Sequence, residues 1–255
     1  MIWVFLSVAL GGILKGATGA GAPLVAIPTI ALFHPDGVRF AVTIFVLPSL
    51  LSNFWQCWTY RHGLLTGPTV WVMSGTGIIG VAAGSWMLSA LDPRYLSLIV
   101  AIGVTIYVTL RLLRVVLDIG ARTGVILAGP VGFAAGLLQG SSGISAPITL
   151  TFLNAMRLPR TTFIATVSTF FLIQTAMQLP ALAFVGLLTC ERLLISLAAF
   201  GVLALFMPVG EWLGGKLSPA IFDKVILSLL ALLAAKMLFD FGWGAVSPSA
   251  TGPAV

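Results

Sequence analysis

Two stretches of the sequence combine glycine, small hydroxyl residues and proline in the same order. They read GATGAGAP at residues 16–23 and GSSGISAP at residues 140–147. Glycine permits backbone turns, and proline suits the first turn of a helix because its missing N–H is not needed there. We therefore expect each stretch to interrupt a helix, with the next helix starting near Pro23 in the first and near Pro147 in the second.

Helices that start at these interruptions could bind an anion. The first turn of a helix presents backbone N–H groups without partners and carries a positive partial charge. We predict that backbone N–H groups of residues 16–21 and 140–143 hold the anion. The hydroxyl groups of Thr18, Ser141 and Ser142 would add hydrogen-bond donors without adding charge.

Several further polar residues are candidates for the same site. Lys15 and Gln139 occupy equivalent positions just before the two interruptions, so one stretch offers a cation where the other offers an amide. Asn53 and Gln174 lie in later apolar segments, where an amide either bonds to another helix or lines a path. The complete set of predicted substrate-binding residues is Lys15, Gly16, Thr18, Gly19, Gly21, Pro23, Asn53, Gln139, Gly140, Ser141, Ser142, Gly143, Pro147 and Gln174.

The glycines also have a simpler interpretation, in helix packing. Glycines four residues apart let membrane helices approach closely. Such patterns occur at Gly12/Gly16, Gly80/Gly84, Gly132/Gly136/Gly140 and Gly210/Gly214. For any one pattern packing is the more common role, but interruptions at corresponding positions of two halves are typical of a transporter substrate site.

The composition indicates what positions these stretches. Of the 255 residues, 59% are hydrophobic and 8% are charged, whereas a soluble domain carries about 25% charged residues. This excludes soluble, disordered and nucleic-acid-binding classes, despite a net charge of +6. The uncharged runs are long enough to cross a bilayer and are continuous, unlike the alternating strands of an outer-membrane barrel. The sequence predicts an all-α, multi-pass membrane protein whose partners are the lipid bilayer and a small anion, with no nucleic acid.

The chain contains the same pattern twice. Glycines and prolines of the two stretches share one spacing of 124 residues, and two later motifs recur at spacings of 123 and 126. In each half an interrupted segment, 2–33 or 123–153, precedes three plainer apolar segments. The plainer segments are 40–58, 69–91 and 95–113, then 162–184, 193–213 and 225–241. We predict two tandem repeats, 1–118 and 119–243, each with one broken or re-entrant segment and three transmembrane helices, followed by a flexible tail at 244–255.

Basic residues predict how the repeats are oriented. If each interrupted segment crosses the membrane once, the basic residues divide evenly between the two sides. If it turns back, or crosses twice, eight lie on one side and four on the other, as the positive-inside rule requires. The eight are Arg61, Arg111, Arg114, Arg122, Arg157, Arg160, Lys216 and Lys224, and the four are Arg39, Arg94, Arg192 and Lys236. This arrangement makes the repeats inverted and places both termini outside the cytoplasm.

The two motifs resemble those of a known family. GILKGATGAGAPLVAIP at residues 12–28 and GLLQGSSGISAPITLTFL at residues 136–153 are similar to sequences of the TauE/SafE family of membrane proteins. The resemblance implies a secondary transporter in a bacterial cytoplasmic membrane that exports sulfite or an organosulfonate such as sulfoacetate. Carried over by position, it implicates Gly16, Gly19, Gly21, Pro23, Gly140, Gly143 and Pro147. An anion channel and a transporter of a non-sulfur small anion are the alternatives.

Residues for catalysis and for proton coupling are scarce. Residues 140–143 fit the GxSG pattern of rhomboid proteases, but the only histidines, His34 and His62, lie in the other half, so the serine would lack a base. Acidic residues fall at or near segment ends, whereas proton-coupled carriers bury them along the path. We therefore expect no enzyme activity, no cofactor and no metal, and we expect the membrane potential to drive efflux. The sequence is compatible with a homo-oligomer as well as with a monomer.

Overall fold

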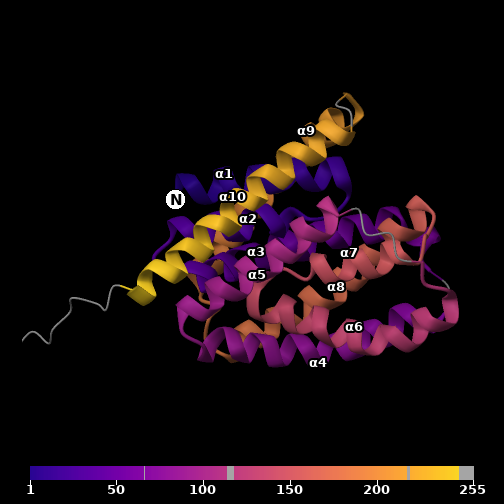
Figure 1. Ribbon diagram of the computed structural model, residues 1–255, viewed down its shortest axis with the longest axis horizontal. Coiled ribbons are helices and arrows are strands. Elements are labelled where there is room, and N and C mark those ends of the chain that lie inside the picture. The colour runs from indigo at the N-terminus through magenta and orange to yellow at the C-terminus, as the bar shows by residue number, and fades with distance from the viewer. Residues whose placement is uncertain (66, 114–117, 217–218, 247–255) are drawn as a thin grey trace, which may run out of the picture.

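A computed structural model describes residues 1–65, 67–113, 118–216 and 219–246, with the backbone alone described at 219–223, 225 and 243–246. This part of the chain is all-α, as predicted (Figure 1). Its α-helices are α1 Ile2–Thr18, α2 Ala22–Phe33, α3 Gly37–Thr59, α4 Pro68–Ala90, α5 Pro93–Leu112, α6 Ala121–Ser142, α7 Ala146–Ala155, α8 Arg160–Phe184, α9 Cys190–Lys216 and α10 Pro219–Val246. Residues 244–246 of the predicted tail belong to α10; residues 247–255 and Arg114 lie outside the described residues.

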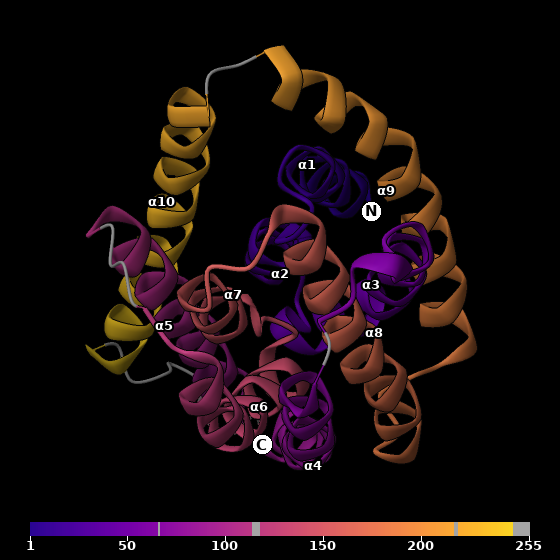
Figure 2. The ribbon, with the colours of Figure 1, turned by 90° about the vertical axis from the view of Figure 1, so that its right-hand side faces the viewer.

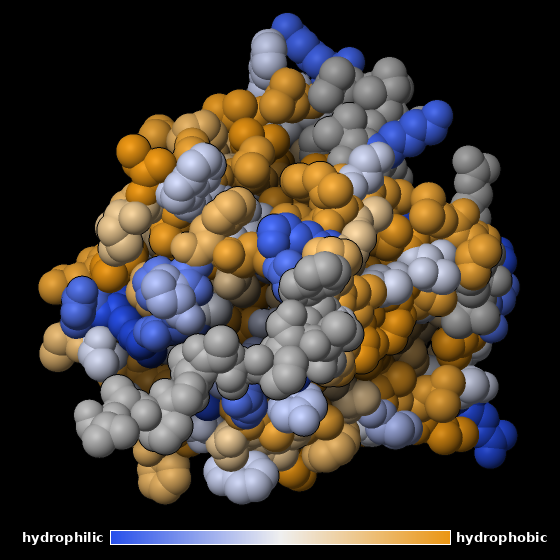
Figure 3. Space-filling view, turned by 60° about the vertical axis from the view of Figure 1, so that its left-hand side comes forward, coloured by the Kyte–Doolittle hydropathy of each residue, from blue (hydrophilic) through white to orange (hydrophobic). Residues whose placement is uncertain are grey.

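Six of the described helices are long and apolar enough to cross a membrane, namely α3, α4, α5, α6, α8 and α9. Shorter apolar helices are α1, α2 and α7. Many outward side chains are large and apolar, and Trp71, Trp86 and Leu205 are among the exposed ones. Figure 3 shows hydrophobic residues over much of one face. The described chain is therefore a multi-pass membrane protein whose surface suits lipid.

The first interruption is a short turn between α1 and α2. α1 ends at Thr18, and α2 starts at Ala22 with Pro23 in its first turn. Between them, Gly19 has a φ of +79° and Gly21 a φ of +90°. Only glycine adopts such angles without strain from a Cβ, which explains why two glycines end one helix and start the next.

The second interruption has the same construction. α6 ends at Ser142, Gly143 has a φ of +68°, and α7 starts at Ala146. Both breaks are shorter than predicted, because residues 16–18 and 140–142 belong to the last turns of α1 and α6. Backbone N–H groups of these residues therefore lie inside helices, and the prediction that they hold an anion is wrong in that respect.

Each broken pair of helices folds back on itself. The rings of Trp3, at the start of α1, and Phe33, at the end of α2, stack with centroids 5.3 Å apart. The N–H of Ile119, just before α6, donates to the carbonyl of Ala155, the last residue of α7, at 2.8 Å. Each pair thus returns to the end of the molecule at which it began.

The first helix of each broken pair packs closely on a helix of the other half, and glycines make the close approach possible. α1 packs against α9, and α6 packs against α4, as Figures 1 and 2 show for α4 and α6. At these contacts an added Cβ would meet neighbouring backbone: Gly16 would meet Met207, Gly210 would meet Ile13, Gly84 would meet Leu137, and Gly140 would meet Val81. The packing interpretation of these glycine patterns is therefore correct.

Several connections that carry basic residues gather at one end, which we call the basic face and define by residues 60–65, 118–120 and 156–160. The N–H of Leu65 donates to Oγ1 of Thr166 at 3.3 Å. Asp118 and Arg157 form an ion pair of 3.2 Å. The α3–α4, α5–α6 and α7–α8 connections consequently lie together.

The α2–α3, α4–α5 and α8–α9 connections gather at the N-terminal face, which we define by residues 34–36, 91–92 and 187–189. Asp36 and Arg192 form an ion pair of 2.6 Å. The side chain of Arg94 donates to the carbonyl of Phe241, near the end of α10, at 2.7 Å. Figure 2 shows α9 and α10 on the periphery, with α1, α2 and α7 between them.

Candidate functional site

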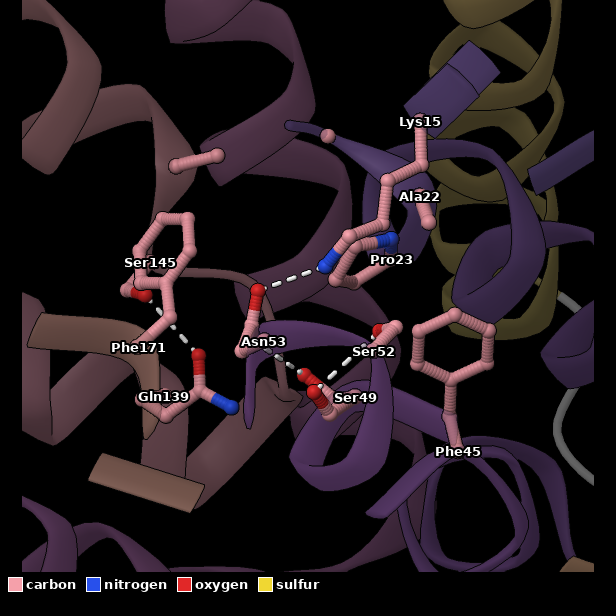
Figure 4. A pocket seen from close by; sticks show the side chains of 12 residues that line it. Lys15, Ala22, Pro23, Phe45, Ser49, Ser52, Asn53, Gln139, Ser145 and Phe171 are labelled. Carbon is pink, nitrogen blue, oxygen red and sulfur yellow. Dashed lines mark hydrogen bonds between the residues drawn. The ribbon is translucent and has the colours of Figure 1, made fainter. Parts of the chain in front are cut away.

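A small cavity lies where the two breaks meet, as Figure 4 shows. Its volume of about 10 Å³ has room for about one water molecule. The lining combines two helix starts with polar side chains and two aromatic rings. It consists of Lys15, Gly21, Ala22, Pro23, Phe45, Ser49, Ser52, Asn53, Gln139, Ser145, Ala146 and Phe171.

The starts of α2 and α7 both open on this cavity. Gly21, Ala22 and Pro23 contribute the first turn of α2, and Ser145 and Ala146 contribute the first turn of α7. A proline stands in the first turn of each helix, as expected where no N–H partner is available. The positive ends of two helices therefore face one space, which is an arrangement that favours an anion.

Lys15 places a positive charge in the same cavity. It is 4% exposed and is the only buried Asp, Glu, Lys or Arg among the side chains that the structure describes. Its Nζ donates to Oδ1 of Asn53 at 2.5 Å, and Nδ2 of Asn53 donates to Oγ of Ser49 at 3.3 Å. A neutral amide cannot balance a buried ammonium, which is costly without an opposite charge. The site is thus electrostatically prepared for an anion.

Gln139 holds the opposite wall of the cavity through a network of amides. Its Nε2 donates to Oε1 of Gln178 at 2.9 Å, and Nε2 of Gln178 donates to the carbonyl of Gln139 at 2.8 Å. Oγ of Ser145 donates to Oε1 of Gln139 at 2.8 Å. Because every polar atom of this amide is engaged, the start of α7 is fixed relative to α6 and α8.

A second amide has a corresponding role at the first break. Nε2 of Gln56, on α3, donates to the carbonyl of Gly19 at 2.8 Å, and Oγ of Ser168 donates to Oε1 of Gln56 at 3.3 Å. The carbonyl at the end of α1 would otherwise be an unpaired acceptor inside the protein. One glutamine on α3 and one on α8 therefore stabilise the two breaks.

The structure brings some of the predicted site residues together at the cavity. Those that line it are Lys15, Gly21, Pro23, Asn53 and Gln139. Gly19 and Gly143 form the turns, and Pro147 lies in the first turn of α7. Gly16 and Gly140 lie at helix contacts instead.

The hydroxyl groups that we predicted as anion donors are engaged elsewhere. Thr18 donates to the carbonyl of Leu14, and Ser141 and Ser142 donate to carbonyls of the preceding turn of α6. A short hydroxyl side chain that donates to a carbonyl of its own helix does not donate that hydrogen to a more distant group. These three residues therefore shape the helix ends and do not line the cavity.

Gln174 also lies away from the cavity. Its amide is fully buried against Gly77 of α4. Neither its nitrogen nor its oxygen has a hydrogen-bond partner in the described part of the structure.

Three serines that the prediction did not include also line the cavity. Ser49 and Ser52 lie three residues apart and Asn53 one residue further, so they share one face of α3. Ser145 directly precedes the first residue of α7, a position typical of helix-capping residues. Helical spacing around Asn53, and the sequence Ser-Ala-Pro, are the signals that could have found them.

Two glutamines one turn apart on α8 should respond oppositely to the same substitution. Gln178→Met removes two bonds to Gln139 and leaves the buried Nε2 of Gln139 without its acceptor, so we expect a loss of about 1–3 kcal/mol of stability. Gln174→Met removes an amide that makes no bond in the described structure, so we expect equal or higher stability. Thermal unfolding in detergent compares the two, and a larger loss in Gln174→Met would contradict this assignment.

The fold and the cavity define a class: a multi-pass membrane protein in which the starts of two helices, each following a break, and a buried lysine line one internal cavity. The family model described as Sulfite exporter TauE/SafE matches residues 4–237. The chain therefore belongs to the TauE/SafE family, as the motifs indicated. Neither a curated protein nor a solved structure matches the chain. Members of this family are membrane transporters of small anions and are not enzymes, which excludes the hydrolase alternative.

Proposed function

We propose that the protein is a secondary transporter that exports a small anion, sulfite or an organosulfonate, through the cavity between the two breaks. The observation that carries this proposal is the convergence of two helix N-termini and the buried ammonium of Lys15 on one space. The cavity of about 10 Å³ is smaller than an oxyanion, so the surrounding helices must separate to admit one. A closed internal site of this kind suits a carrier better than a channel, which needs a continuous pore.

Contacts between equivalent helices of the two halves support two inverted repeats, 1–118 and 119–243. α1 packs on α9 of the other half, and α6, its equivalent, packs on α4, the equivalent of α9. Each broken pair folds back, and the three helices α3, α4 and α5 lie between them. Because three crossings separate the two hairpins, they would enter from opposite sides of the membrane.

The distribution of charge supports an orientation with the basic face in the cytoplasm. Ion pairs and hydrogen bonds join the connections within each face. The two faces formed in this way agree with the arrangement in which eight basic residues lie on one side of the membrane and four on the other. The positive-inside rule then places the basic face in the cytoplasm of a bacterial cell and the N-terminal face outside.

Cysteine labelling tests this orientation. Cys190 is exposed at the start of α9, close to the N-terminal face. We expect a membrane-impermeant maleimide to label Cys190 of the Cys57→Ser variant in intact cells. Asp118→Cys, in a chain that lacks both native cysteines, should react only after the cells are opened. The reverse pattern would contradict the orientation.

Vesicles that contain the purified protein test the transport function. No described Asp or Glu is buried, so no internal proton relay is available in this part of the chain. A monovalent anion gains about 2.3 kcal/mol per 100 mV, which is roughly fifty-fold in concentration. We expect saturable sulfite or sulfonate flux that follows an imposed potential. Absent flux, flux that follows only a pH gradient, or flux at channel rates would contradict the proposal.

A further inference from the structure

The interior of the described part of the chain contains one buried positive charge. Lys15 is 4% exposed, and no described acidic side chain is buried with it. Position 139 corresponds to position 15 at the spacing of 124 residues, and it holds a neutral glutamine. The cavity therefore has one lysine where a fully symmetric site would have two.

Helix ends add almost no net charge to the site. α2 and α7 present positive N-termini to the cavity, but each break also contains the negative C-terminus of α1 or α6. A helix dipole places about half an elementary charge of each sign at its ends, so the two ends at each break nearly cancel. Amides of Gln56 and Gln178 bind carbonyls at these C-termini. The helix starts therefore supply N–H donors and a locally positive potential toward the cavity, but the net charge of the site is that of Lys15.

A buried site with one charge favours a ligand with one opposite charge. Moving an ion from water into a protein interior is costly unless the ion is paired. A monovalent anion beside Lys15 forms a neutral pair, whereas a divalent anion leaves one negative charge without a partner. The other polar side chains of the lining are neutral and cannot supply a second charge; they are Ser49, Ser52, Asn53, Gln139 and Ser145.

We propose that the cavity selects monovalent oxyanions over divalent anions of similar size. Lys15 is the counter-ion, and the neutral side chain of Gln139 is the specificity-determining feature of the other half. This inference rests on the proposed function and narrows its substrate class. Hydrogen sulfite and sulfonates without a second acidic group are preferred to the sulfite dianion and to sulfoacetate.

Two anions of similar size test the preference directly. Isethionate and sulfoacetate are both two-carbon sulfonates. They differ at the second carbon, which carries a hydroxyl group in isethionate and is the carboxylate carbon in sulfoacetate. Calorimetry with the purified full-length protein at constant ionic strength should give at least about tenfold tighter binding of isethionate. Equal affinities, or tighter binding of sulfoacetate, would overturn the inference while leaving an anion transporter in place. If neither these anions nor sulfite binds, the proposed function itself fails and the inference falls with it.

A second lysine should change the preference. In Gln139→Lys the cavity gains a second cation at the equivalent position, and the ratio of the two affinities should shift at least about tenfold toward sulfoacetate. Gln139→Met removes the same amide without adding charge, so it keeps the preference for isethionate whatever its effect on affinity. Equal ratios in the two variants would overturn the role of Gln139. If Gln139→Lys does not fold, the ratio in the unmodified protein decides.

Discussion

Replacing Lys15 with methionine is expected to weaken binding of a monovalent sulfonate about 100-fold or more. Nζ of Lys15 lies in the cavity beside Asn53, where it would form a desolvated pair with the anion. Removing one partner of such a pair costs about 2–5 kcal/mol, and about 2.7 kcal/mol corresponds to 100-fold. Calorimetry with isethionate on the purified variant measures the change.

A matched lysine separates this effect from the general charge of the protein. Lys236 is exposed and pairs with Asp240 at 2.7 Å, so Lys236→Met should keep the affinity of the unmodified protein. Lys15→Met should fold, because replacing a buried charge with an apolar side chain of similar size is often neutral or stabilising. A folded Lys15→Met protein with unchanged affinity would remove Lys15 from the site.

Replacing a glycine at the contacts between the two halves with alanine should cause the largest losses of stability. A Cβ at Gly84 would meet the carbonyl of Leu137, and a Cβ at Gly210 would meet the carbonyl of Ile13. Because backbone atoms cannot yield as a flexible side chain does, α4 and α6, or α9 and α1, must move apart. We expect a loss of about 1–3 kcal/mol in each variant, and more where the helices resist separation.

Glycines on the same helices provide the controls for this prediction. Gly75 on α4 and Gly201 on α9 have no heavy atom within 4 Å of an added Cβ. Alanine favours a helix by about 1 kcal/mol relative to glycine, so Gly75→Ala and Gly201→Ala should unfold at the same temperature or higher. Melting temperatures in detergent test all four variants. Similar values for Gly84→Ala and Gly75→Ala would contradict the close α4–α6 contact.

Much of the fold could be predicted from the sequence because a bilayer constrains helix length. The apolar segment 40–58 lies within α3 Gly37–Thr59, and 162–184 lies within α8 Arg160–Phe184. The same pattern indicated a break before Pro23 and another before Pro147. Exact break lengths required backbone angles, since it is the positive φ of Gly19 that ends α1, and neighbouring glycines looked alike in the sequence.

The site was predictable where charge or position singled out a residue. Lys15 and Asn53 are polar groups in apolar segments, and both line the cavity. Ser141 and Ser142 also looked like donors, but a serine near a helix end can bond to its own helix, and the sequence does not reveal which bond forms. Gly16 was ambiguous for another reason, because a glycine suits both a helix contact and a turn, and only its position beside α9 separates the two roles.

Locating a bound anion tests the central claim most directly. Selenite is a selenium analogue of sulfite, and selenium can be located by anomalous X-ray scattering in crystals of the protein with the ion bound. The account predicts a selenium peak in the cavity, within reach of Nζ of Lys15 and between the starts of α2 and α7. A peak only on the basic face near Arg157 and Arg160, or no peak at a concentration that saturates transport, would contradict it.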